Sequence, residues 1–152
     1  MTDKTDPIKV FVVHLFSKDV DYLRVFEYLE SRDNFLYLNT GDPERMPTGG
    51  GKEEMKEELR NQIKAAEIMI LPISTYDRNR DLVTFQLDVA AACDKPVLAV
   101  KSFGDTVVLQ KLILERSEEV VDWNERVLVD SIRRLARHED TARWDVVEFK
   151  LD

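Results

Sequence analysis

Residues 8–15 read IKVFVVHL, an almost continuous run of β-branched and aromatic side chains. Such a run is typical of a strand that is buried on both faces of a parallel sheet. Residues 19–32 follow it with an amphipathic pattern, because apolar side chains recur there at helical spacing. Asp19 favours the N-cap of this helix. The stretch therefore predicts a strand that leads directly into a helix.

The rest of the chain repeats this alternation. Apolar runs predict further strands at residues 34–39, 67–73, 97–101 and 120–123. Helical patterns lie between and after them, at residues 52–66, 82–93 and 124–135, with a short helix or turn at 106–114. We expect Asp81 to cap the helix at 82–93 and Asn124 to cap the last helix.

Strands that alternate with helices predict an α/β fold with a parallel sheet. For these strands we expect the flavodoxin-like, three-layer arrangement, a five-stranded sheet in the order 2-1-3-4-5 with helices on both faces. The 152 residues have the size of one ordinary domain. We therefore predict a single domain over residues 1–152, with a core at about 8–137 and a C-terminal tail at 138–152. Residues 144–149 of the tail alternate apolar and polar side chains, which indicates an edge strand or an interaction segment.

Composition narrows the classes of function. The net charge of −8 and the isoelectric point of about 4.9 argue against a nucleic-acid-binding surface. No apolar run approaches the roughly 20 residues of a membrane-spanning helix, and residues 1–6 are too polar for a signal peptide. The single cysteine, Cys93, fits a reducing compartment and is predicted to be a small buried hydrophobe. We therefore expect a cytoplasmic protein that binds neither nucleic acid nor membranes.

The expected strand order also predicts where a ligand binds. In such sheets ligands bind beyond the carboxyl ends of the strands, at the point where the strand order reverses. Here that point lies between the ends of the first and third strands. Residues 40–51 form a long, glycine-containing loop beside it, and such loops are often functional. Six candidate ligand-binding residues are expected at this edge: His14, Phe16, Ser17, Asn39, Ser74 and Tyr76.

Several of these residues have a structural alternative. His14 is either a ligand contact or general base, or a buried histidine whose hydrogen bonds are satisfied. Phe16 either stacks on a base or covers the end of the sheet. Ser74 and Tyr76 either contact a nucleotide or belong to a turn.

Two common site motifs are missing from the sequence. Residues 47–52 read PTGGGK, but a phosphate-binding loop requires glycine where Met46 stands and Ser or Thr where Glu53 stands. The two histidines are far apart in the sequence and the chain has no cysteine pair, so we predict no metal site.

Four segments together resemble a known family. They are the opening strand and turn at residues 9–19, the helix and strand at 56–76, the helix and strand at 82–100, and residues 121–124 before the last helix. In this order and spacing they are similar, over about residues 8–135, to the bacterial TIR-like family, which includes the TIR proteins of Thoeris anti-phage systems. Many members cleave NAD at the nicotinamide–ribose bond. The resemblance implies NAD or ADP-ribose as the ligand, with NAD as a substrate rather than a cofactor, and self-association or a partner protein.

The resemblance also implies a catalytic glutamate on the helix after the third strand, and this chain has Gln86 there. A carboxylate stabilises the positive charge that develops on the ribose ring, whereas a glutamine amide carries no charge. Gln86 is therefore either a ribose contact in a weakened site or a polar residue on a partly exposed helix face. The sequence leaves open whether the protein is an enzyme.

Three functional hypotheses follow from the resemblance. The first is a nucleotide-binding signalling domain in anti-phage defence, with weak or latent NAD glycohydrolase activity. The second is a catalytically inactive module that assembles with copies of itself or with a partner protein. The third is an enzyme like the nucleoside deoxyribosyltransferases, which would need a carboxylate nucleophile in the same cleft.

Overall fold

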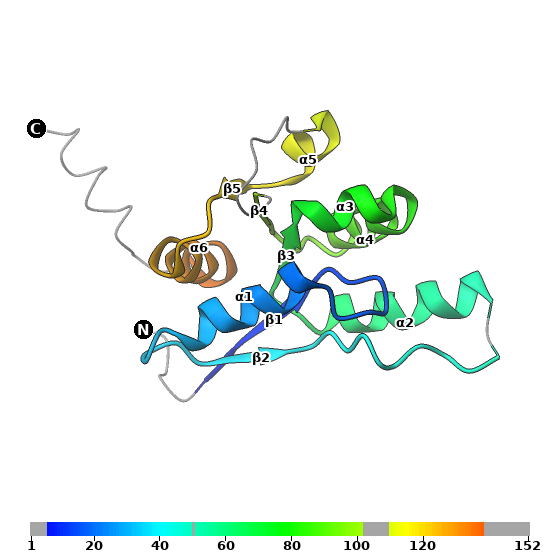
Figure 1. Cartoon of the computed structure of the whole chain (residues 1–152), viewed down its shortest axis with the longest axis horizontal. Helices are drawn as coiled ribbons and strands as arrows, with labels where there is room; N and C mark the ends of the chain where they lie inside the picture. Colours follow the sequence, from blue (N-terminus) through cyan, green and yellow to red (C-terminus); the bar gives the residue numbers. More distant parts are fainter. Residues whose placement is uncertain (1–5, 50, 102–109, 139–152) are drawn as a thin grey trace, which may run out of the picture.

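A computed structural model describes residues 6–49, 51–101 and 110–138, and the strands in these residues form one parallel sheet (Figure 1). The strands are β1 (Ile8–Val12), β2 (Tyr37–Asn39), β3 (Ile68–Pro72), β4 (Val97–Val100) and β5 (Glu119–Val121). Their order is β2-β1-β3-β4-β5, and every neighbouring pair is parallel. The predicted α/β class and strand order are confirmed.

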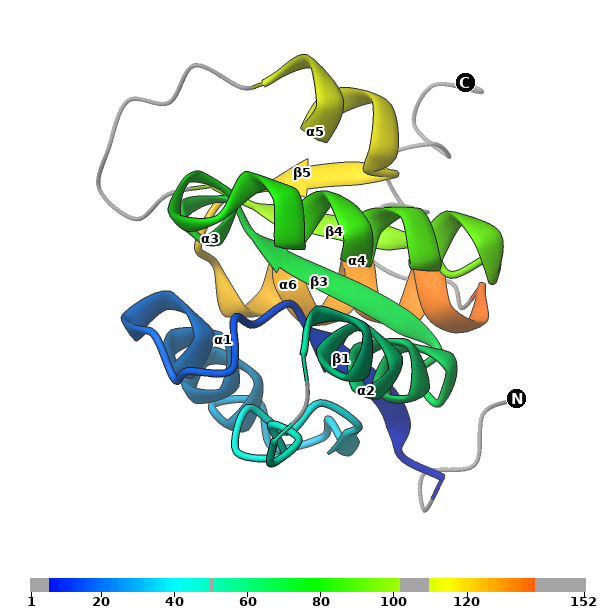
Figure 2. The ribbon, with the colours of Figure 1, turned by 90° about the vertical axis from the view of Figure 1, so that its right-hand side faces the viewer.

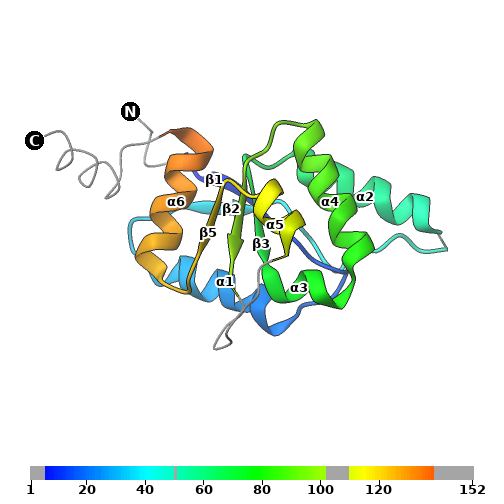
Figure 3. The same ribbon diagram turned by 90° about the horizontal axis from the view of Figure 1, so that it is seen from above.

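Helices cover both faces of this sheet, as the view from above shows (Figure 3). One face carries α1 (Val20–Glu30) and α6 (Glu125–Arg137). Residues of the other four helices pack against the opposite face: α2 (Lys52–Lys64), α3 (Ile73–Arg78), α4 (Arg80–Ala92) and α5 (Lys111–Arg116). The arrangement is the three-layer one that the sequence predicts.

The two faces explain why the central strands are almost entirely apolar. Along β1, Val10 and Val12 point into the core beneath α1 and α6, whereas Phe11 points into the core beneath α2 and α4. Met69 and Ile70 divide in the same way along β3. Successive side chains of a strand point to opposite faces, so most positions of a strand covered on both sides are shielded from water. Lys9, near the start of β1, is exposed and is the exception.

The segment after β3 is the largest difference from the sequence prediction. Ser74 and Tyr76, for which a turn was one of two alternatives, lie in α3, which begins at Ile73 directly after the strand. Pro72 holds the N-cap position of α3, where its φ of −67° suits the proline ring. The helix has six residues, less than two helical turns, and a period of 3.6 residues does not show in so short a segment.

The helix α4 begins earlier than predicted, and a different residue caps it. Asn79 occupies the N-cap, and its Oδ1 accepts a hydrogen bond from the backbone N–H of Leu82 at 3.1 Å. Asp81, the predicted cap, lies within the first turn. Asp19 does occupy the N-cap of α1, but its side chain makes no capping hydrogen bond. The prediction for Asp81 was wrong because three consecutive residues near this helix start are polar, and only the backbone geometry selects among them.

Other boundaries move by a few residues. The strands β2 and β5 are each three residues long, shorter than predicted. The predicted Asn124 cap of α6 is confirmed, because its Oδ1 accepts from the N–H of Val127 at 3.0 Å. Cys93 is half-buried rather than buried, at the end of α4. Of the helix or turn predicted at 106–114, residues 106–109 lie outside the described part, as do residues 139–152 of the tail. None of the described helices is long and apolar enough to cross a membrane.

Candidate functional site

The fold brings the ends of β1 and β3 together at the point where the strand order reverses (Figure 2). The two strands are parallel neighbours, and the N–H of Val13 donates to the carbonyl of Ile70 at 2.9 Å, one residue beyond the end of β1. The turn that starts at His14 and the helix α3 that starts at Ile73 therefore leave the sheet at the same edge. This edge carries the residues that the sequence predicts as a site.

His14 is buried, with 1% of its surface exposed, and both ring nitrogens are hydrogen-bonded. The backbone N–H of Phe16 donates to Nδ1 at 3.0 Å. Because Nδ1 is the acceptor, Nε2 carries the proton and donates to Oε1 of Gln62 at 2.9 Å. Burial lowers the pKa of the ring, while the hydrogen bond that His14 donates to Gln62 and the charges of Asp42 and Glu58 oppose that change. The structure thus gives His14 the satisfied, neutral environment of its structural alternative.

Gln86 is completely buried on α4 and reaches across to the end of β1. Its Nε2 donates to the carbonyl oxygen of His14 at 2.9 Å and to that of Leu82 at 3.4 Å. Its Oε1 is buried without a hydrogen-bond partner among the described residues. A position on a partly exposed helix face, one of the two alternatives for Gln86, is therefore wrong.

Phe16 lies directly against His14 in a strained backbone conformation. Its φ is +59°, in the left-handed region that residues other than glycine rarely adopt. The hydrogen bond from its N–H to His14 and an edge-to-face ring contact, with centroids 5.1 Å apart, hold it there. The neighbouring Ser17 is exposed, and its hydroxyl donates to a carboxylate oxygen of Asp19 at 3.1 Å.

Asn39 reaches the same cluster from the end of β2. Its Nδ2 donates to the hydroxyl of Tyr22 at 3.2 Å, and its Oδ1 accepts from the N–H of Gly41 at 2.9 Å. The ring of Tyr22 meets that of His14 edge to face, with centroids 6.2 Å apart. Burial raises the pKa of the Tyr22 hydroxyl. Asn39 itself is exposed, so it can be reached from solvent.

Ser74 and Tyr76 point to other partners. The hydroxyl of Ser74 donates to Asp21 on α1 at 2.7 Å, and the same carboxylate pairs with Arg24. Tyr76 is 7% exposed and packs in the core under the guanidinium of Arg80. The structure therefore brings His14, Phe16, Asn39 and Gln86 into one connected cluster, here called the edge cluster. No hydrogen bond in the described part of the chain ties Ser17, Ser74 or Tyr76 directly to it.

The comparisons with known proteins agree with this architecture. The family model of the TIR-like domain of the Thoeris protein ThsB matches residues 11–106, more than half of the chain. This chain belongs to that family. A comparison with curated proteins gave no match. The matched part of this TIR-like domain runs from within β1 to beyond β4, so it includes the whole edge cluster.

Sequence reasoning missed two residues that complete the edge of this TIR-like domain. Gln62 on α2 is 5% exposed and binds His14, and Asp42, in the loop between β2 and α2, binds Gln62 through its backbone. The signal for Gln62 was available, because it lies three residues after Leu59 and one before Ile63, on the buried side of an otherwise charged helix. A polar residue on an apolar helix face has to find a polar partner inside the fold. No comparable pattern marked Asp42.

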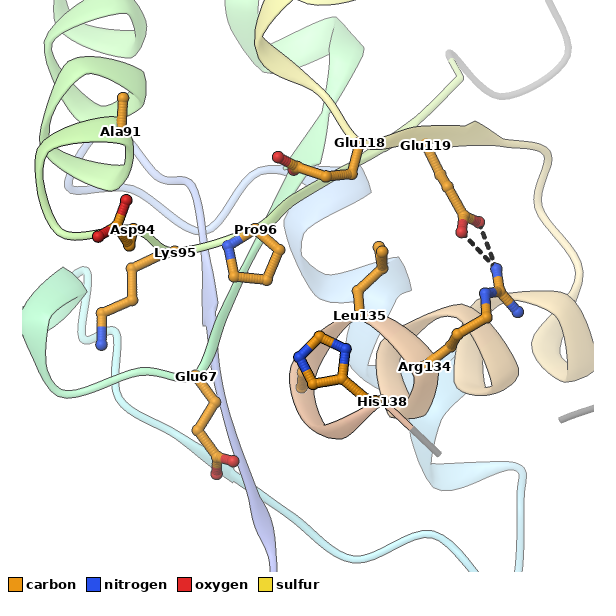
Figure 4. Close-up of a pocket in the computed structure, with 11 residues that line it drawn as sticks. Glu67, Ala91, Asp94, Lys95, Pro96, Glu118, Glu119, Arg134, Leu135 and His138 are labelled. Carbon is orange, nitrogen blue, oxygen red and sulfur yellow. Dashed lines mark hydrogen bonds and ion pairs between the residues drawn. The ribbon is translucent and has the colours of Figure 1, made fainter. Parts of the chain in front are cut away.

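A separate hollow of about 770 Å³ lies at the opposite, amino-terminal edge of the sheet (Figure 4). It is bordered by Glu67 before β3, Pro96 before β4 and the first residue of β5, Glu119, together with the end of α6. In Figure 4 Glu119 meets Arg134, and the Nη2–Oε1 distance is 2.6 Å. No pattern in the sequence predicted this hollow, and no residue of the edge cluster lines it.

Proposed function

We propose that this TIR-like domain binds a nucleotide of the NAD or ADP-ribose class at the carboxyl edge between β1 and β3. It acts as a signalling domain in bacterial anti-phage defence, and its NAD glycohydrolase activity is weak or latent. The observation that supports the catalytic part of this proposal is the environment of Gln86, whose amide donates to the carbonyl oxygen of His14.

The chemistry explains why this environment matters. Breaking the nicotinamide–ribose bond develops positive charge on the ribose ring, and an anionic carboxylate stabilises that charge. Gln86 carries no charge, and its amide nitrogen already donates to the carbonyls of His14 and Leu82. The loss of one electrostatic group of this kind typically costs about 3–4 kcal/mol of barrier, or two to three orders of magnitude in rate.

Groups suited to nucleotide binding remain at the same edge. Phe16 is half-buried, so one part of its ring is available to stack on a base. Ser17 and Asn39 are exposed and offer a hydroxyl and an amide to ribose hydroxyls or phosphate oxygens. These groups support binding without supplying a catalytic carboxylate.

The test is calorimetric titration with NAD and ADP-ribose, combined with chromatography of NAD incubated with the protein. We expect binding of at least one of the two nucleotides, with turnover close to background. Phe16→Leu should weaken binding, whereas Tyr28→Leu, which also truncates a half-buried aromatic residue but contacts Trp123 on another part of the fold, should not. Gln86→Glu should gain turnover at about pH 8, where a carboxylate is ionised.

Two outcomes would contradict the proposal. Ready turnover by the wild type would contradict weak or latent activity, and Asp21 would then be the first carboxylate to replace, because it contacts Ser74 at the same edge. The deoxyribosyltransferase-like alternative would need the same carboxylate. Failure of both nucleotides to bind would contradict the ligand site itself.

One observation favours the assembly module as a second candidate. Among the described residues β2 is the end strand of the sheet, and Leu36 just before it and Leu38 within it are 51% and 52% exposed. Unpaired strand edges with exposed apolar side chains are sites at which another chain can add a strand. If nucleotides do not bind, concentration-dependent association that Leu38→Lys abolishes and Leu114→Lys preserves would support this function. Leu114, on α5, is 53% exposed and serves as the matched control.

A further inference from the structure

The side chain of Gln62 uses its full hydrogen-bonding capacity inside the fold. Its Oε1 accepts from Nε2 of His14 and from the backbone N–H of Asp42, both at 2.9 Å. Its Nε2 donates to the backbone carbonyl of Asp42 at 3.3 Å and to Glu58 at 2.8 Å. An amide has two donors and one oxygen with two lone pairs, so no position is left unused. A fully satisfied buried polar group of this kind fixes the orientation of everything bound to it.

These bonds join two segments that leave the sheet at different strands. On one side, the N–H of Phe16 donates to Nδ1 of His14, and Nε2 of His14 donates to Gln62. On the other side, both backbone groups of Asp42 bind the same amide. The turn after β1 and the loop after β2 are therefore connected through one side chain that belongs to neither of them.

Other connections between the two segments are weaker. The ion pair of Lys18 and Glu44 spans 3.6 Å, but the side chains are 49% and 77% exposed. Exposed pairs of this kind contribute little, because water and salt screen them and two flexible side chains must be ordered. The buried amide of Gln62, by contrast, leaves unsatisfied groups on both segments when it is removed.

We propose that Gln62 is a positioning residue that couples the turn at residues 14–17 to the loop at residues 40–42, so that a nucleotide bound at either segment orders both. This inference rests on the proposed nucleotide site. Gln62 accepts from the protonated Nε2 of His14 and so holds the ring in place, which in turn positions the Nδ1 that accepts from the N–H of Phe16. The same amide sets the position of Asp42, which lies three residues after the candidate ligand contact Asn39.

The first experiment uses NMR of the full chain without ligand. In the wild type, the ring nitrogen signals of His14 should show a proton on Nε2. In Gln62→Met, which keeps a similar volume but lacks the amide, the N–H of Phe16 still keeps the proton of His14 on Nε2, but that proton loses its acceptor. The Nε2–H signal of His14 and the amide signal of Asp42 should therefore both move. Asn61→Met is the matched control, because Asn61 is exposed on the same helix turn and should change neither signal. Unchanged His14 and Asp42 signals in Gln62→Met would overturn the coupling.

The second experiment adds ADP-ribose to the same samples. In the wild type the amide signals of Phe16 and Asp42 should shift together along the titration. In Gln62→Met the shift at Asp42 should vanish. The affinity for ADP-ribose should fall by about tenfold, which corresponds to a loss of about 1.4 kcal/mol in binding free energy when the hydrogen bonds of Gln62 are removed. Full affinity with both shifts retained would overturn the coupling. If the wild type does not bind ADP-ribose or NAD while the ligand-free result holds, the nucleotide site is wrong and the coupling of the two segments stands.

A second variant covers the case in which Gln62→Met does not fold. Gln62→Glu retains an acceptor for Nε2 of His14 but adds a negative charge beside the ring, where Asp42 and Glu58 already exert their charges and the Tyr22 ring packs. The pH at which His14 takes up a proton should therefore rise relative to the wild type. An unchanged titration of His14 in Gln62→Glu would contradict the contact on which the coupling depends.

Discussion

The side-chain amide of Gln86 donates a hydrogen bond to the backbone carbonyl oxygen of His14, with 2.9 Å between Nε2 and O, across 72 residues of sequence. Both residues are almost fully buried. A carboxylate cannot make this bond, because it has no proton to donate unless it is neutralised. Gln86, the residue that the resemblance suggests for the family's glutamate position, therefore has a structural partner that suits its amide.

Gln86→Glu should destabilise the fold in a pH-dependent way. At about pH 8 the new carboxylate faces the carbonyl oxygen of His14, and we expect a loss of about 1–3 kcal/mol in the free energy of unfolding. Burial raises the pKa of such a carboxyl above its unfolded value. The variant is therefore closest to the wild type at low pH, where the protonated carboxyl can donate to the carbonyl, and the deficit grows as the pH rises.

Urea unfolding of Gln86→Glu and the wild type at about pH 5 and pH 8 measures this dependence. Gln86→Met is the control, since it lacks both the hydrogen bond and a titratable group and should show the same deficit at both pH values. A deficit for Gln86→Glu that does not change with pH would contradict the contact between Gln86 and His14.

His14 should make the fold less stable as the pH falls below about 6.5. Burial lowers the pKa of the ring in the folded state, so between the two pKa values the unfolded chain binds more protons than the folded one. The contribution of the neutral His14 ring to stability is therefore fully present above the unfolded pKa. It is lost as the pH falls towards the folded pKa, and the total loss is about 1.4 kcal/mol for each unit by which folding lowers the pKa.

Unfolding free energies measured between about pH 5 and pH 7.5 test this dependence. His14→Phe should remove most of the slope in that interval, because the phenylalanine ring does not titrate. His138→Gln replaces the other histidine, an exposed residue at the end of α6, and should keep the slope. A slope that persists in His14→Phe would show that another group causes it.

Asn79→Ala should cost more stability than Asp81→Ala. Asn79 supplies the capping oxygen for the N–H of Leu82, and loss of such a cap typically costs about 1 kcal/mol. Asp81 lies in the first turn of α4, where its charge interacts with the helix dipole and its removal costs about 0.3–0.5 kcal/mol. Thermal or urea unfolding of the two variants distinguishes them. The reverse ranking would restore Asp81 as the cap.

Gly41→Ala should destabilise the loop after β2. A Cβ at this position would lie 3.1 Å from Cδ1 of Phe11 and 3.3 Å from Oδ1 of Asn39, closer than ordinary contacts. Phe11 is fully buried and cannot move away without disturbing the core, so we expect a cost of about 1–3 kcal/mol.

Gly51→Ala is the matched control for Gly41→Ala. The nearest atom to its Cβ would be Oε2 of Glu54 at 3.7 Å, which is an ordinary contact. Gly51 caps α2, where glycine is preferred to alanine, but alanine also reduces the freedom of the unfolded chain. These effects oppose each other, and we expect a change within about 0.5 kcal/mol. Equal effects of the two substitutions in urea unfolding would contradict the crowding at Gly41.

The architecture of this protein could be predicted from patterns within short segments of its sequence. Nearly continuous apolar runs such as residues 8–15 indicate burial on both faces, and their alternation with amphipathic helices leads to a parallel sheet in the observed order. The sheet order then located the edge at which His14, Phe16 and Asn39 meet. These features depend on periodicity within short segments, which the sequence displays directly.

The hydrogen-bond partners of the residues at that edge follow only from the tertiary structure. The bonds of Gln86 to His14 and of Gln62 to His14 span 72 and 48 residues, and Ser74 pairs with Asp21 on another helix. A hydrogen bond depends on distance and direction to within a few tenths of an ångström, and these are set when helices pack onto the sheet. Local sequence contains no measure of that packing. The resemblance implied a role for Gln86 at the family's glutamate position, but no local pattern predicted that its amide is buried against a strand end.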